Sequence, residues 1–126
     1  MLLDSLAGYL NNVESAVQGL EDAYVEFYEE EIIASDRINL RIRLRFSSGY
    51  LLELNESVVA EGEIKHLGYR YHFQDKQNNL VFRYDNTPHF RDLESFPNHK
   101  HTQSEVESCN KPSILDVIEE TKAHGK

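Results

Sequence analysis

Residues 38–54 read INLRIRLRFSSGYLLEL, and this stretch decides the fold. Over residues 38–46, apolar side chains alternate strictly with polar ones, which is the pattern of a β-strand with one buried face. The polar side of this strand carries three arginines, Arg41, Arg43 and Arg45. Ser48 and Gly49 supply a turn, and residues 50–54 return as the next strand. The sequence therefore predicts an antiparallel pair with an apolar face and a basic face.

The same alternation recurs further along the chain. Residues 69–73 and 80–84 each alternate, and the polar run at 75–79 closes a hairpin between them. We therefore expect residues 24–85 to form an antiparallel sheet of about five to six strands. If the faces align, four side chains form a basic floor on the polar side of the sheet: Arg43, Arg70, His72 and Arg83.

The two ends of the chain have helical spacing. Apolar residues spaced by three and four predict a helix over residues 1–20, and a second, short helix is predicted over 113–122. Residues 86–112 show little periodicity and are interpreted as a long His-rich loop. The prediction is a single α+β domain spanning 1–126. The apolar stripe of the first helix could pack on the sheet, or serve a homodimer or partner interface.

The charge is unevenly distributed. The formal net charge is −9, and residues 1–36 hold nine carboxylates and no Lys or Arg. Residues 37–101 hold ten basic and eight acidic residues, together with five of the six histidines. The middle of the chain is therefore mildly basic, which suits an anionic partner such as RNA. The single cysteine, the absence of a membrane-length apolar run and an acidic N-terminus predict a cytoplasmic protein without membrane association.

Residues 82–101, FRYDNTPHFRDLESFPNHKH, combine histidines with fixed charges and are the candidate site. Histidines titrate near neutral pH and can act as base and acid, while Arg and Lys can stabilise phosphate charge. The candidate catalytic residues are Arg83, Asp85, His89, His99, Lys100 and His101. The candidate substrate-binding residues are Arg41, Arg43, Arg45, Arg70, His72 and Tyr84.

Each candidate has an expected role in RNA cleavage. His89 and either His101 or His99 would form the acid–base pair, and Arg83 and Lys100 would hold the phosphate. Asp85 would orient a histidine or Arg83. Tyr84 would stack on a base or donate a hydrogen bond.

Cleavage with a metal ion and cleavage without one are both compatible with these residues. His99 and His101 are two residues apart on an extended segment and point the same way, so they could instead ligate a divalent metal with Asp85 and His89. We favour the reaction without a metal and expect no cofactor.

Four blocks of sequence resemble the TumE-like toxin family. They are YRYHFQD at 69–75, LVFRYDNTPH at 80–89, FPNHKH at 96–101 and KPS at 111–113. The resemblance covers about residues 65–120. Two positions depart from it, because Phe90 and Asn98 stand where the family commonly has histidines, and neither is therefore expected to be required.

The resemblance implies a prokaryotic toxin of a type II toxin–antitoxin module, often encoded beside a helix-turn-helix antitoxin. Combined with the chemistry above, it predicts a small ribonuclease toxin. The alternative is a non-catalytic module that binds nucleic acid or protein through the same basic, His-rich surface. An enzyme requires His89 and His99 or His101 to meet near Arg83 in one pocket, whereas a binding module needs only an open surface.

Overall fold

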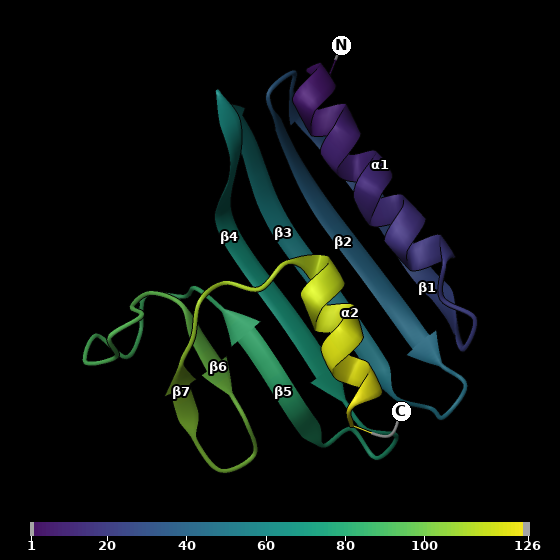
Figure 1. Ribbon diagram of the computed structural model, residues 1–126, viewed down its shortest axis with the longest axis vertical. Helices are drawn as coiled ribbons and strands as arrows, with labels where there is room; N and C mark the ends of the chain where they lie inside the picture. Colours follow the sequence, from purple (N-terminus) through teal and green to yellow (C-terminus); the bar gives the residue numbers. More distant parts are fainter. Residues whose placement is uncertain (1, 125–126) are drawn as a thin grey trace.

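The computed structural model describes residues 2–124, which form two helices and seven strands (Figure 1). In chain order these are α1 (Asp4–Gln18), β1 (Ala23–Ala34), β2 (Arg37–Phe46), β3 (Leu51–Glu61), β4 (Glu63–Gln74), β5 (Leu80–Asp85), β6 (His99–His101), β7 (Val106–Ser108) and α2 (Ile114–Lys122). All seven strands belong to one sheet in the order β1 to β7, and every neighbouring pair is antiparallel. The predicted α+β fold is confirmed.

Strands β1 to β5 match the sheet predicted over residues 24–85, and the strand count differs only because of residues 86–112. Residues 57–65 continue the sheet, because β3 and β4 meet in a tight hairpin at Gly62, whose φ of +78° favours glycine. The segment 86–112 is not a loop throughout, because it contains β6 and β7. These strands have three residues each, and β6 is held by backbone pairing with β5, so their sequence carries no apolar period.

One face of the sheet holds the core. The alternating residues of β2 to β5 point towards α1 and α2, which both cover this face (Figure 1). The largest fully buried side chains on the strands include Phe46, Tyr71, Phe73 and Phe82. The buried face of α1 is formed by Leu6, Leu10, Val13 and Val17. The predicted stripe of the first helix therefore packs on the sheet.

Helix α2 begins with a capping box. The Ser113 side chain accepts a hydrogen bond from the Asp116 backbone N–H, and the Asp116 carboxylate accepts one from the Ser113 backbone N–H. This satisfies two donors at the helix start and fixes the point where the chain returns over the sheet. Ile114, Val117 and Ile118 then enter the core.

The other face of the sheet carries the polar side chains in register. One cross-strand row runs over five strands: Arg43, Glu53, His72, Arg83 and His101. The neighbouring row contains Arg41, Asn55, Arg70, Asp85 and His99. Directly opposite residues share a face, so the expected alignment of Arg43, Arg70, His72 and Arg83 is confirmed. We call this surface the open face.

Strand β1 forms one edge of the sheet and is mostly exposed. It combines a run of carboxylates, Glu29, Glu30 and Glu31, with apolar side chains at the surface. Ile32 is the most exposed of these, at 62%.

Candidate active site

Asp85, the last residue of β5, brings the candidate site together. Its Oδ1 lies 2.7 Å from His99 Nε2 and also accepts a 3.1 Å hydrogen bond from the Thr87 backbone N–H. Its Oδ2 lies 3.3 Å from Arg83 Nε and 3.8 Å from His101 Nε2. Strand pairing makes this possible, because Asp85 faces His99 across β5 and β6, and Arg83 faces His101. One carboxylate thus joins three of the predicted side chains.

His99 is locked in place by two acceptors. Its ring is almost fully buried, and its Nδ1 lies 2.9 Å from the Pro97 carbonyl oxygen, which can only accept a hydrogen bond. Nδ1 must therefore carry a proton. Nε2 faces a carboxylate oxygen of Asp85 at 2.7 Å. The arrangement holds the ring and the carboxylate in a fixed orientation.

His101 is the more accessible histidine of the pair. Its ring centroid lies 4.8 Å from that of His99, and its side chain is 17% exposed. Burial lowers the pKa of His101, and the positive charge of Arg83 lowers it further, against the opposing effect of Asp85. His101 is therefore neutral at pH 7 and able to accept a proton.

Phe90 covers both histidines. Its ring lies 5.1 Å from the His99 ring and 5.6 Å from the His101 ring. The residue has a φ of +58°, a conformation that side chains other than glycine rarely adopt. His89 lies beside Phe90 at 6.1 Å between ring centroids and is exposed. The loop therefore places His89 at the rim of the cluster, while Phe90 limits water access to it.

Arg83 and His72 each have a buried nitrogen without a hydrogen-bond partner. The buried Arg83 Nε lies close to Asp85 but makes no hydrogen bond within residues 2–124, and the same is true of His72 Nδ1. The two residues face each other across β4 and β5. Burial lowers the pKa of His72, and the charges of Arg70 and Arg83 add to this effect. His72 Nε2 lies 3.0 Å from Gln74 Oε1, which only accepts a hydrogen bond, so the unpaired Nδ1 of the neutral ring is an acceptor. The Arg83 guanidinium, with its unpaired N–H, favours an anion at this position.

Two predicted residues lie on the opposite side of the sheet. Lys100 and Tyr84 face each other across β5 and β6 on the helix-covered face. Lys100 Nζ binds Glu120 of α2 at 2.7 Å, and the Tyr84 hydroxyl donates to the same carboxylate at 2.5 Å. The expectation that Lys100 and Tyr84 line the site beside the histidines is wrong, because alternate residues of a strand point to opposite faces.

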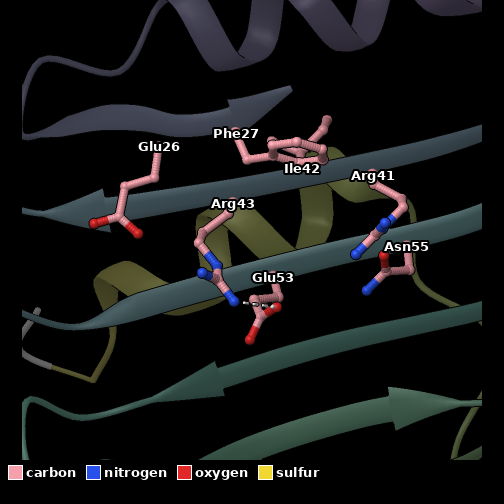
Figure 2. A pocket seen from close by; sticks show the side chains of 7 residues that line it. All are labelled: Glu26, Phe27, Arg41, Ile42, Arg43, Glu53 and Asn55. Atoms are coloured by element: carbon pink, nitrogen blue, oxygen red, sulfur yellow. Dashed lines mark hydrogen bonds and ion pairs between the residues drawn. The ribbon is translucent and has the colours of Figure 1, made fainter. Parts of the chain in front are cut away.

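The remaining predicted arginines lie on the open face, away from the histidines. Arg43 pairs with Glu53 at 3.2 Å, and Arg45 pairs with Glu26 at 3.0 Å. Arg41 lies over the Phe27 ring, 5.5 Å from its centroid (Figure 2). Arg70 is exposed and faces Asp85 across β4 and β5. The strands thus form a continuous polar surface between these arginines and the Asp85 cluster.

A known protein family matches most of the chain. A family model described as Toxin TumE matches residues 16–124. The chain belongs to the TumE toxin family. The resemblance inferred from the four sequence blocks is therefore confirmed. The toxin matches no curated protein and no solved structure. Neither described helix of the toxin is long and apolar enough to cross a membrane.

Within residues 2–124, one group of side chains could hold a metal ion. The ligand atoms of Asp85, His99 and His101 all lie within 4.8 Å of one another. One feature fits a cation poorly, namely the guanidinium of Arg83 beside the same carboxylate. The contact of His99 Nδ1 with the Pro97 carbonyl leaves Nε2 facing the cluster, which is compatible with metal binding. The donor set is chemically suitable, but its electrostatic surroundings favour an anion.

A second buried carboxylate of the toxin lies on the helix-covered face. Glu56 of β3 accepts hydrogen bonds from the hydroxyls of Tyr9 and Tyr71, and its Oε2 lies 3.0 Å from His66 Nε2. Burial alone would raise the pKa of Glu56, but His66 and the two hydroxyls outweigh it and keep this pKa low. Burial and the charge of Glu56 raise the pKa of Tyr9 and Tyr71 in turn.

Sequence reasoning missed two aromatic residues of the toxin's open face. Phe90 was judged dispensable because it departs from the family pattern, yet its ring covers His99 and His101. Phe27 lies in an acidic strand and is not among the predicted site residues. Its alternation with Glu29, which pairs with Arg41, places it opposite Arg43, but a register shift between Val25 and Phe27 hides this from the sequence pattern.

Proposed function

We propose that this toxin is a ribonuclease that cleaves RNA phosphodiester bonds with the Asp85 cluster, without a metal ion. The observation that carries the proposal is the contact of one carboxylate with His99, His101 and Arg83 at the end of a basic sheet surface. A base, an orienting carboxylate and a phosphate-binding cation therefore lie within reach of one substrate phosphate.

The proposed reaction begins at His101. Its neutral ring takes the proton of the 2′-hydroxyl, and the 2′-oxygen then attacks the adjacent phosphorus. Arg83 stabilises the negative charge that develops on the phosphate oxygens. The bond from phosphorus to the 5′-oxygen breaks, leaving a 2′,3′-cyclic phosphate on one fragment.

The leaving 5′-oxygen needs a proton, and we assign its delivery to His89 at the rim of the cluster. His99 is unsuited to this role because its ring is buried and both of its nitrogens face acceptors within the protein. Its role is to hold Asp85, and through Asp85 the His101 ring, in orientation.

The basic side chains of the open face would bind the phosphates of neighbouring nucleotides. This group comprises Arg41, Arg43, Arg45, Arg70 and His72, and it excludes Lys100 and Tyr84, whose side chains face α2. Contacts of this kind give affinity without sequence preference and weaken with salt.

The test is toxicity and RNA integrity after induction in bacteria. We expect induction of the wild type to stop growth and degrade RNA, and induction of His101→Ala to do neither. The matched control is His124→Ala, which removes an exposed histidine outside the cluster. Growth arrest with intact RNA in wild type would instead favour the non-catalytic binding module. Cleavage by purified wild type that is lost with a chelator and restored by a divalent ion would support the metal-assisted reaction.

The family implies an antitoxin as partner. We propose that it is a helix-turn-helix protein, and that toxin and antitoxin meet in the cytoplasm of a prokaryote. Coexpression with the product of the neighbouring reading frame, followed by size-exclusion chromatography, tests this proposal. The same measurement on the toxin alone shows whether it forms a homodimer.

A further inference from the structure

A hollow on the open face lies away from His99 and His101. It has a volume of about 530 Å³ and is formed over β1, β2 and β3 (Figure 2). Its lining includes Phe27, Arg41, Arg43 and Asn55, together with the carboxylates Glu26 and Glu53, which pair with Arg45 and Arg43. An aromatic ring, guanidinium groups and an amide thus meet in one concave surface.

Phe27 offers a stacking surface in this hollow. Its side chain is 43% exposed, and the Arg41 guanidinium lies 5.5 Å from the ring centroid. Single-stranded nucleic acids bind to such surfaces, because every base has a flat π face that stacks on an aromatic ring or a guanidinium plane. The amide of Asn55 lies beside Arg41 and can hydrogen-bond to a base edge (Figure 2).

A second hollow connects the first to the catalytic cluster. It has a volume of about 410 Å³, shares Arg41 and Asn55 with the first, and extends to Arg70 and Thr87. Thr87 donates its backbone N–H to Asp85, so this end adjoins the cluster. Gly68 lines the second hollow, and a Cβ placed there would meet nothing nearer than Asn86 Oδ1 at 4.0 Å. The two hollows form one groove.

The charges of the groove suit a polyanion. Arg43 and Arg45 are each paired with a carboxylate, but Arg41 and Arg70 have no such partner within residues 2–124. Both unpaired guanidinium groups lie along the groove, one beside Phe27 and the other beside Asp85. They are free to bind the phosphates of a strand lying between the two hollows.

We propose that this groove binds single-stranded RNA next to the cleaved bond and that Phe27 and Arg41 hold one base at its far end. The proposal deepens the ribonuclease function and rests on it for the identity of the ligand. Phe27 lies on β1 and His101 on β6, five strand spacings apart, which is about 24 Å. Only an RNA of several nucleotides can reach both residues, so a dinucleotide does not engage Phe27.

Binding is measured on the full chain carrying His101→Ala, which should prevent cleavage. The probes are fluorescein-labelled octauridylate and octaadenylate, and the readout is fluorescence anisotropy. Adding Phe27→Ala should weaken binding of both probes about tenfold, the size of one lost base stack. Phe27→Trp should restore it. The matched control is Ile32→Ala, which removes another exposed apolar side chain of the same strand and should leave affinity unchanged.

Two further variants separate the parts of the groove. Arg41→Ala should reduce the dependence of log affinity on log salt by about 0.7, the contribution of one phosphate contact on a single strand. Gly68→Val should weaken binding by filling the second hollow, since a β-branched side chain is compatible with the strand. Circular dichroism and thermal melting establish that each variant is folded.

The outcomes distinguish this proposal from the ribonuclease function. Phe27-dependent binding by a toxin that cleaves no RNA would support the groove and overturn the nuclease. Cleavage by wild type, with equal octamer affinity in the Phe27 and Ile32 variants, would overturn the groove alone. A toxin that neither binds nor cleaves RNA would contradict both. Support for both proposals requires one further result. In the toxin that retains His101, Phe27→Ala should lower the ratio of the octamer cleavage rate to the dinucleotide cleavage rate about tenfold.

Discussion

Two buried carboxylates on opposite faces of the same sheet have different surroundings. Glu56 lies under the helices, where Tyr9, Tyr71 and His66 surround its two oxygens. Asp85 lies on the open face, where its neighbours include an accessible histidine and an arginine with an unpaired N–H. Both carboxylates are less than 6% exposed, so burial does not distinguish them.

The difference lies in what the partners can still bind. The donors around Glu56 are directed inwards, so the cluster joins α1 to β3 and β4 and is complete in itself. The donors around Asp85 retain capacity for a ligand, since Arg83 and His101 are reached from solvent. A satisfied buried carboxylate stabilises a fold, whereas one with unsatisfied neighbours marks a site.

The largest expected effect is a loss of stability when Glu56 is replaced. Glu56→Ala should lower the free energy of unfolding by about 3 kcal/mol, because it leaves buried hydroxyls and His66 without an acceptor. Chemical denaturation measures this loss. The low pKa of Glu56 in the folded state also means that its contribution is present above its unfolded pKa and lost as the pH falls through the folded one. An unchanged stability would show that the cluster is not structural.

Asp85→Asn should act on cleavage instead. We expect the rate to fall about 100-fold, because a neutral amide cannot replace the carboxylate that contacts His99 and orients His101. The exposed Asp92 provides the matched control, Asp92→Asn, and thermal melting separates folding from activity. A variant that cleaves RNA at the wild-type rate would remove Asp85 from the mechanism.

A smaller effect tests the division between the two faces. Lys100→Met should lower stability by about 1 kcal/mol through loss of the half-buried pair with Glu120, without changing the cleavage rate. Lys122→Met, which removes an exposed pair with Glu119, should change neither quantity measurably. If the folded Lys100 variant cleaved RNA tenfold more slowly, Lys100 would have to act from the helix-covered face.

The smallest effect is a displacement of the pH profile. Protonated His101 cannot act as a base, so the rate should fall with decreasing pH through its pKa, which burial and Arg83 hold below the ordinary 6.5. Arg83→Met should raise that pKa and move the acidic limb towards neutral pH. The measurement is kcat/KM against pH, normalised to each variant's maximum. An unmoved limb would assign it to a group other than His101.

Much of the fold could be predicted because its strands have one buried face. The alternation of apolar and polar side chains predicted β2. The same pattern correctly placed four side chains on the open face of the sheet: Arg43, Arg70, His72 and Arg83. The short strands β6 and β7 could not be found in this way, because their place in the sheet comes from backbone pairing with β5. A hydrogen-bond ladder between distant segments leaves no apolar period in either one.

The site was predicted in part for the same reason. The separation of His99 and His101 by two residues correctly indicated a shared direction, and it should also have directed Lys100 to the other face. The contact of Phe90 with both histidines depends on a loop conformation with positive φ, which residue type alone does not reveal.

The acidic edge strand has a consequence for self-association. A twelve-residue edge with exposed apolar side chains could add a strand from another copy and polymerise. In antiparallel self-pairing, Glu29, Glu30 and Glu31 of each molecule would approach the same run in the next, and like charges would oppose every addition. Acidification or high salt weakens that repulsion. The charge of β1 thus disfavours extension of the sheet by a strand from a second molecule.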